Sequence, residues 1–108
     1  MIDIEPRYLA EIKTTLKAEL PNCDVWVFGS RVRESATKYS DVDLAVIGEG
    51  RIDWRVLEKV KDSFARSDLP FMVDVLDWNA ISREFQLVIE RRYEVIQTGE
   101  AKPGESPD

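Results

Sequence analysis

The chain has 108 residues with 21 acidic and 15 basic side chains, a formal net charge of −6 and no histidine. A chain of this length fits one domain, and its acidic balance argues against nucleic-acid binding, which depends on clusters of lysine and arginine. The lack of histidine excludes histidine-dependent triads, zinc sites built on histidine and histidine general bases, so carboxylates and metal-bound oxygens would have to carry any chemistry.

The cysteine count and the hydropathy pattern indicate the cellular compartment in which the protein is expected. Cys23 is the only cysteine, so no internal disulfide can form and a reducing compartment is compatible. We expect Cys23 to be a small, half-buried residue before a strand. No apolar run is long enough to cross a membrane, and no basic-then-apolar leader begins the chain. We therefore expect a cytoplasmic protein.

The first half of the chain predicts two helices and two strands in alternation. Apolar residues recur at helical spacing from Pro6 to Leu20, which predicts a packing helix. Residues 24–28 are largely β-branched and aromatic, and predict a strand that ends at Gly29-Ser30. A short helix from about Ser30 and a turn at Lys38-Tyr39 then lead to a second strand from Asp41 to Ile47.

The second half repeats this alternation. Asp53 to Arg66 predicts an amphipathic helix, with Asp53 as its N-cap and Trp54 as a packing aromatic. Residues 71–76 predict a third strand, a further helix follows Asp77, and residues 93–96 predict a last short strand.

These elements predict an α/β or α+β domain with helices packed on one sheet, spanning residues 1–98. Residues 99–108 differ in composition and have no apolar anchor. They predict a disordered acidic tail.

Two aspartates open the second predicted strand. Side chains alternate along a strand, so Asp41 and Asp43 project to one face and the residues between and after them to the other. Two adjacent carboxylates repel one another unless a cation lies between them, and hard oxygen ligands favour Mg²⁺ or Mn²⁺. The alternative is a turn-to-strand junction with both carboxylates solvated, because an Asp-x-Asp pair alone is a weak signal.

The Gly29-Ser30 turn has the composition of a phosphate-binding loop. Glycine permits a sharp turn and close approach of a ligand, while the serine hydroxyl and the following backbone N–H groups can bind phosphate oxygens. Arg31 and Arg33 add positive charge, and the planar guanidinium suits phosphate. We expect at least one of these arginines to be a solvated surface residue, and favour Arg33 as the phosphate ligand.

A third carboxylate interrupts the apolar run at residues 71–76. If Asp74 is buried it needs a cation or a hydrogen-bonding partner, because an unpaired buried charge is costly. The alternative is an edge-strand aspartate facing water. We favour Asp74 as a site residue, and expect Asp77 to be a turn or helix-cap residue.

Together these residues resemble the polymerase-β-like nucleotidyltransferase superfamily, and most closely its short prokaryotic branch, the minimal nucleotidyltransferases. The family pattern is roughly G-S-x-A-R-G, a spacer, S-D-x-D-L and a separate strand aspartate. Here it reads G-S-R-V-R-E from Gly29, then Ser40-Asp41-Val42-Asp43-Leu44 without insertion, then Asp74. The resemblance covers nearly the whole chain and implies a mixed sheet with helices packed on it.

The resemblance also implies an activity: transfer of a nucleoside monophosphate from a nucleoside triphosphate to an acceptor hydroxyl. In that role Asp41, Asp43 and Asp74 are the metal ligands and catalytic residues, for two Mg²⁺ ions, and Asp74 also draws the proton from the acceptor. Gly29, Ser30 and Arg33 hold the phosphates of the donor, which by the family resemblance is expected to be ATP, although no residue here identifies the base.

Two positions depart from the family pattern. Val32 stands where alanine is usual, a change of packing, and Glu34 stands where glycine is usual. Glutamate loses backbone freedom and brings a negative charge toward the expected triphosphate.

The acceptor and partner are implied by the family alone. Minimal nucleotidyltransferases act as antitoxins that adenylylate a tyrosine of a HEPN-type ribonuclease toxin, so a toxin partner, or a homo-oligomer that completes the cleft, is expected. Glu34 keeps open a catalytically weakened antitoxin that acts by binding alone. A small-molecule nucleotidyltransferase and a metal-dependent phosphohydrolase also stay open at this point.

Overall fold

A computed structural model describes residues 2–32 and 40–100 of the chain. Its elements, in order, are α1 (Pro6–Glu19), β1 (Asp24–Phe28), the 3₁₀ helix η1 (Gly29–Val32), β2 (Val42–Ile47), α2 (Trp54–Ala65), β3 (Val73–Asp77), the 3₁₀ helix η2 (Trp78–Ala80), α3 (Arg83–Glu90) and β4 (Glu94–Gln97). The strands form one mixed sheet in the order β3-β2-β1-β4, in which β2 and β3 are parallel and β1 is antiparallel to both of its neighbours.

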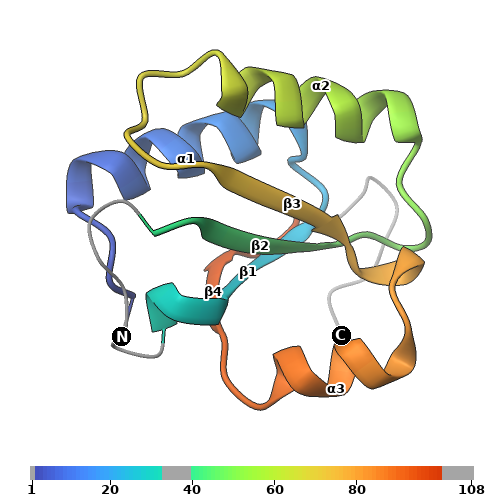
Figure 1. The fold of residues 1–108 in the computed structure, drawn as a ribbon. Helices are drawn as coiled ribbons and strands as arrows, with labels where there is room; N and C mark the ends of the chain where they lie inside the picture. The colour runs from blue at the N-terminus through green and yellow to red at the C-terminus, as the bar shows by residue number, and fades with distance from the viewer. Residues whose placement is uncertain (1, 33–39, 101–108) are drawn as a thin grey trace.

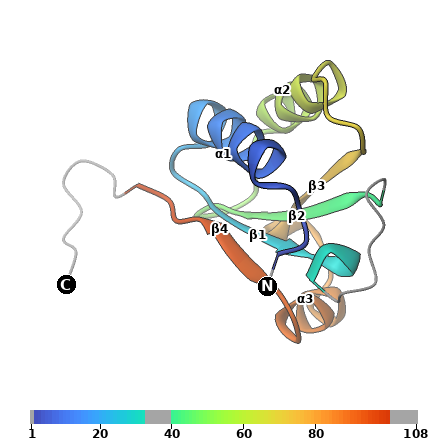
Figure 2. The same cartoon turned by 90° about the vertical axis from the view of Figure 1, so that its left-hand side faces the viewer.

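Helices cover the two faces of this sheet unequally. Figure 1 shows α1 and α2 side by side on one face, and α3 with η1 on the other. Figure 2 shows the same arrangement from a second direction. The sheet therefore has one closed face and one face that is only partly covered.

The closed face carries the core. Side chains alternate along β1 and β2, so every second residue points toward α1 and α2. The central members of this core have no exposed surface: Ile12, Leu16, Val25, Val27, Leu44, Val46 and Val60. Each buried aliphatic side chain of this size contributes about 1.5–3 kcal/mol relative to an exposed one, and this face holds the domain together.

Aromatic contacts attach the α3 segment to the open face. The ring of Tyr93 stacks on Trp26 of β1 at 3.9 Å between centroids, and Trp78 meets Trp26 edge-on at 5.0 Å. Phe85 of α3 meets Phe28 of β1 edge-on at 6.1 Å. These contacts all involve β1, so α3 is anchored toward that side of the sheet rather than over β3.

The predicted helices and strands are present, with boundaries shifted by one or two residues, and the mixed α+β architecture is confirmed; the turn predicted at Lys38-Tyr39 lies outside the described residues. Asp53 accepts a hydrogen bond from the backbone N–H of Arg55 and caps α2 as predicted. The packing role predicted for Trp54 is wrong: it is the first residue of α2, where the helix begins beyond the core, and it is 68% exposed. The helix η2 was not predicted.

The described chain continues two residues beyond the predicted domain boundary. Gly99 donates its backbone N–H to a carboxylate oxygen of Asp24, and Glu100 donates its own to the carbonyl of Pro21. The rest of the predicted tail lies outside the described residues. No helix in the described ranges is both long enough and apolar enough to cross a membrane.

Candidate active site

The end of β1 places Gly29 against a carboxylate. Gly29 has φ of +79°, a conformation that side chains with a Cβ rarely adopt. A Cβ built at this position would overlap the Oδ2 atom of Asp43. Because Phe28 pairs with Asp43 in the β1–β2 ladder, the Gly29-Ser30 turn begins directly beside this aspartate. Glycine is therefore required here for both its backbone angle and its lack of a side chain.

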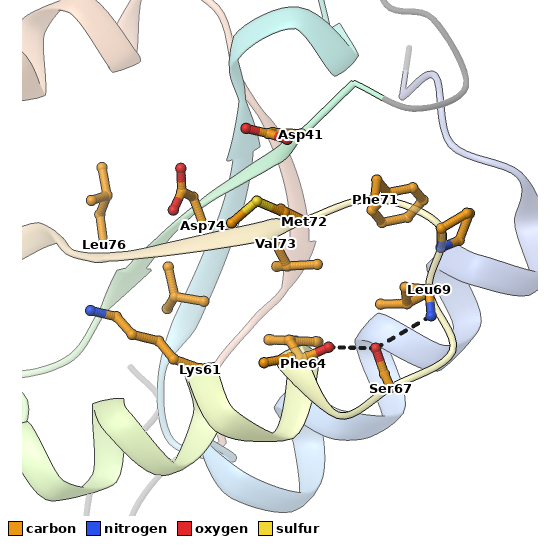
Figure 3. A pocket seen from close by; sticks show the side chains of 13 residues that line it. Asp41, Lys61, Phe64, Ser67, Leu69, Phe71, Met72, Val73, Asp74 and Leu76 are labelled. Atoms are coloured by element: carbon orange, nitrogen blue, oxygen red, sulfur yellow. Dashed lines mark hydrogen bonds between the residues drawn. The ribbon is translucent and has the colours of Figure 1, made fainter.

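The register of the sheet brings a second carboxylate to the same place. Asp43 of β2 lies opposite Asp74 of β3 in the parallel ladder, so both side chains share one face. Asp41 lies just before β2, two residues from Asp43. Figure 3 shows Asp41 and Asp74 on the same side of these strands, with Lys61 and Phe64 of α2 on the other. The sheet thus aligns the three aspartates along its open face.

Asp74 is exposed to water on an edge strand. Of the two settings that the sequence left open, the exposed one is therefore correct and the buried one is wrong. β3 lies at the edge of the sheet and Asp74 is exposed, so no buried charge demands a partner. What relates Asp74 to the site is its register with Asp43. Like charges directly opposite one another on neighbouring strands are unfavourable unless a cation or donor lies between them.

Of the two arginines that follow the Gly29-Ser30 turn, the structure describes Arg31 but not Arg33. Arg31 is buried, with 4% of its surface exposed, and donates to the carbonyl of Ser40 at 2.7 and 3.1 Å and to that of Asp3 at 2.9 Å. Its guanidinium also lies 4.8 Å from the centre of the Phe71 ring. Arg31 therefore ties the start of β2 to the N-terminal segment. Arg33, the favoured phosphate ligand, and Glu34 lie outside the described residues.

Carboxylate oxygens are the ligands that Mg²⁺ prefers, and Asp41, Asp43 and Asp74 could provide one or two of them to an ion. Within residues 2–32 and 40–100, no three His, Cys, Asp or Glu side chains converge on a point where they could hold a metal. Mg²⁺ commonly takes only one or two carboxylates and completes its shell with waters and substrate phosphates. A facing pair such as Asp43 and Asp74 suits that mode, with triphosphate oxygens as further ligands.

Members of this carboxylate row line two hollows. One, of about 750 Å³, runs along the edge strand β3, with Asp41 and Asp74 in its lining on one side and residues of α2 on the other (Figure 3). The other, of about 360 Å³, lies between the end of β1 and α3, and includes Gly29 and Asp43. Sequence reasoning missed the second hollow, because the residues that α3 contributes follow an ordinary amphipathic pattern.

Solved structures share this fold. A structure described as a toxin–antitoxin with AMP-PNP superposes with a TM-score of 0.72 at 20% sequence identity, over 85% of this chain and 74% of that chain. A complex of the tri-AMPylated HEPN toxin of Shewanella oneidensis with an MNT antitoxin gives a TM-score of 0.59 at 21% identity, over 83% of this chain and 69% of that one. At these identities the likeness establishes the fold.

A mixed sheet with a Gly-Ser turn beside paired aspartates defines a nucleotidyltransferase domain. The sequence agrees: residues 10–100 match the model of the polymerase beta nucleotidyltransferase family, and the chain belongs to that family. It is also 46% identical over 99 residues to a protein of Haemophilus influenzae named probable protein adenylyltransferase MntA, an alignment that covers 92% of this chain and 87% of the relative. The family predicted from the motifs is thereby confirmed.

Proposed function

We propose that this protein is a protein adenylyltransferase of the cytoplasm that transfers AMP from ATP to a tyrosine hydroxyl of a HEPN-type toxin, and so acts as an antitoxin. The observation that carries this proposal is the alignment of Asp43 with Asp74, beside Gly29, a position that only glycine can fill. The Haemophilus influenzae relative is named as a protein adenylyltransferase, and one structural neighbour is an AMPylated HEPN toxin with its MNT antitoxin. Both support the same acceptor class.

In this proposal each site residue has a distinct task. Asp41, Asp43 and Asp74 would hold two Mg²⁺ ions, which would supply positive charge to neutralise the triphosphate. Asp74 accepts the proton of the tyrosine hydroxyl, whose oxygen forms a bond to the α-phosphorus as the bond to the β-phosphate oxygen breaks. Pyrophosphate leaves, and Gly29 and Ser30, with Arg33, hold its phosphates throughout.

The acceptor approaches from the β3 side in this arrangement. β3 is the edge of the sheet, Asp74 is exposed on it, and the larger hollow runs along it. The described residues form a single sheet with its helices and provide no separate domain to grip an acceptor. A partner protein that brings its own tyrosine to this edge would supply that function.

The test is transfer of label from ATP to the toxin in the presence of Mg²⁺. Asp41→Asn and Asp43→Asn should each reduce transfer by at least about 100-fold, because each removes charge that organises the transition state. Asp62→Asn is the matched control, since Asp62 is an exposed carboxylate on α2 that pairs with Arg66 on the same helix face. Transfer that persists in the Asp41 and Asp43 variants would refute the assignment.

Glu34 in place of the family's usual glycine favours a second candidate: an antitoxin that acts by binding alone. In that case the purified protein would bind and neutralise the toxin without transferring label. Neutralisation by both aspartate variants, together with no transfer by the natural protein, would establish this candidate in place of the first.

A further inference from the structure

The smaller hollow is lined by two arginines, Arg91 and Arg92, that have no role in the proposed function. Its lining residues come from the end of β1, from β2 and from one side of the α3 segment: Phe28, Gly29, Asp43, Phe85, Val88, Ile89, Arg91 and Arg92. Phe85 and Val88 are one turn apart on α3, and Arg91 and Arg92 follow directly after the helix ends at Glu90. The α3 side of the hollow is therefore apolar along the helix and doubly basic at its end.

Neither arginine has a partner within the described part of the chain that would explain its position. Among the described residues, no hydrogen bond or ion pair involves the guanidinium of Arg91 or Arg92. Among the other exposed arginines of the described ranges, Arg83 lies 3.3 Å from Glu90 and Arg66 lies 3.1 Å from Asp62, whereas Arg51 also has no such partner. Arg91 and Arg92 are neighbours in the chain and line one hollow, and an anion bound there would offset the repulsion between their like charges.

A helix C-terminus favours a cation through the helix dipole, and this effect is one explanation for a basic residue here. It does not explain why both arginines line the same hollow as Gly29 and Asp43. The arginines lie at the α3 side, and the turn that binds phosphate in the proposed function lies at the β1 side. An anion between them would be bound from both sides.

The arginines are held in this place by their neighbours in the chain. Before them, Phe85 packs against Phe28 of β1, and after them, Tyr93 stacks on Trp26 of the same strand. The hydroxyl of Ser82 accepts a hydrogen bond from the backbone N–H of Phe85 and fixes the start of α3. The segment is therefore anchored to β1 at both ends of the basic pair.

We propose that Arg91 and Arg92 bind the β- and γ-phosphates of the donor triphosphate, and the pyrophosphate that leaves, from the side opposite Gly29. The two hollows share no lining residue. The donor's phosphates occupy the α3 side of the carboxylate row, and the acceptor keeps the β3 side, where Asp41 and Asp74 lie. The inference rests on the proposed function for the identity of the donor.

Direct binding tests the inference without requiring any turnover. Calorimetry measures the affinity for ATP, pyrophosphate and AMP, each with Mg²⁺. Arg91→Ala and Arg92→Ala should each lower the affinity for ATP and for pyrophosphate roughly 10-fold, which is the order of one lost hydrogen bond to a charged group. AMP, which lacks the β- and γ-phosphates, should bind the variants as it binds the natural protein. Arg83→Ala is the matched control on the same helix, because its partner is Glu90.

Steady-state kinetics with the toxin gives the second readout. Arg91→Ala and Arg92→Ala should raise KM for ATP with little change in toxin affinity. Unchanged ATP and pyrophosphate affinity would overturn the inference, as would weaker toxin binding with unchanged ATP binding, which would place the arginines in the partner interface. An equal loss of affinity for ATP, pyrophosphate and AMP would also overturn the inference, since that pattern indicates a disturbed fold. Failure of the natural protein to transfer AMP would refute the proposed function and leave the calorimetric test intact.

Discussion

Single residues decide whether the site can form at all, and Gly29 and Arg31 do so in different ways. Gly29 leaves room for the carboxylate of Asp43, and its backbone angle of +79° is open to glycine. Arg31 has the composition of a phosphate ligand in the sequence, yet its guanidinium is used within the fold on the carbonyls of Ser40 and Asp3. The motif thus contains both a residue that shapes the site and one that holds the strand carrying it.

Replacing Gly29 with alanine should damage both stability and transfer. A left-handed backbone angle costs an L-residue about 1–2 kcal/mol. The new Cβ would also displace Asp43, and a misplacement of about 1 Å in a catalytic group can cost on the order of 100-fold in rate. Urea denaturation and AMP transfer measure the two effects.

Gly50→Ala is the control for that change. Gly50 has no atom within 4 Å of the Cβ position and no positive φ. Its replacement should leave both measurements near those of the natural protein. Normal transfer by Gly29→Ala would show that the contact with Asp43 is not needed for activity.

The strand β3 carries two aspartates in different environments, one exposed and one buried. Asp74 is exposed and lies opposite Asp43. Asp77 is buried, with 6% of its surface exposed, and accepts hydrogen bonds from the backbone N–H groups of Ile52 at 2.9 Å and Asn79 at 3.1 Å. Three positions separate the two aspartates, so they fall on opposite faces of the strand. The cap role predicted for Asp77 is confirmed, because Asp77 is the N-cap of η2 and its side chain accepts a hydrogen bond from the backbone N–H of Asn79.

Substituting each aspartate with asparagine should separate their roles. Asp74→Asn should leave the unfolding free energy unchanged or slightly higher, because it removes a like charge opposite Asp43, while transfer falls about 10²–10⁴-fold because the proposed general base is lost. Asp77→Asn should lower the unfolding free energy by about 1–2 kcal/mol, because an amide has only one acceptor oxygen for two backbone donors.

Chemical denaturation and transfer assays on the same two proteins supply the comparison. Each variant serves as the other's control, since both make the same chemical change on one strand. A large loss of stability in Asp74→Asn, or full transfer by that variant, would contradict the division of roles.

Across the whole sheet, one face carries the core and the other carries the three aspartates proposed as the site. The helices α1 and α2 cover one face (Figure 1), and the three aspartates and the smaller hollow lie on the other, while the larger hollow runs along the edge strand β3 and is partly lined by α2. The molecule as a whole is acidic, with a net charge of −6. A long-range field of this sign speeds encounter with a positively charged partner more than it strengthens the complex.

The association rate with a basic toxin should therefore fall as salt is raised. At about 0.15 M ionic strength, exposed charges are screened beyond about 8 Å, and at 1 M beyond about 3 Å. We expect a decrease of roughly 10-fold or more in the association rate over this range, with a much smaller change in the dissociation rate. Surface plasmon resonance at several salt concentrations measures both, and a salt-independent association rate would exclude electrostatic steering.

The family, the order of the helices and strands, and the placement of Asp41 and Asp43 on one face could be predicted from the sequence, because they depend on local periodicity and short spacings. The fold was needed to show that Asp74 lies opposite Asp43, that Arg31 is buried and that Trp54 is exposed. It also decided that Arg91 and Arg92 line the hollow beside Gly29. Each of these depends on contacts between residues far apart in the chain, through strand register and helix packing, which no local pattern encodes.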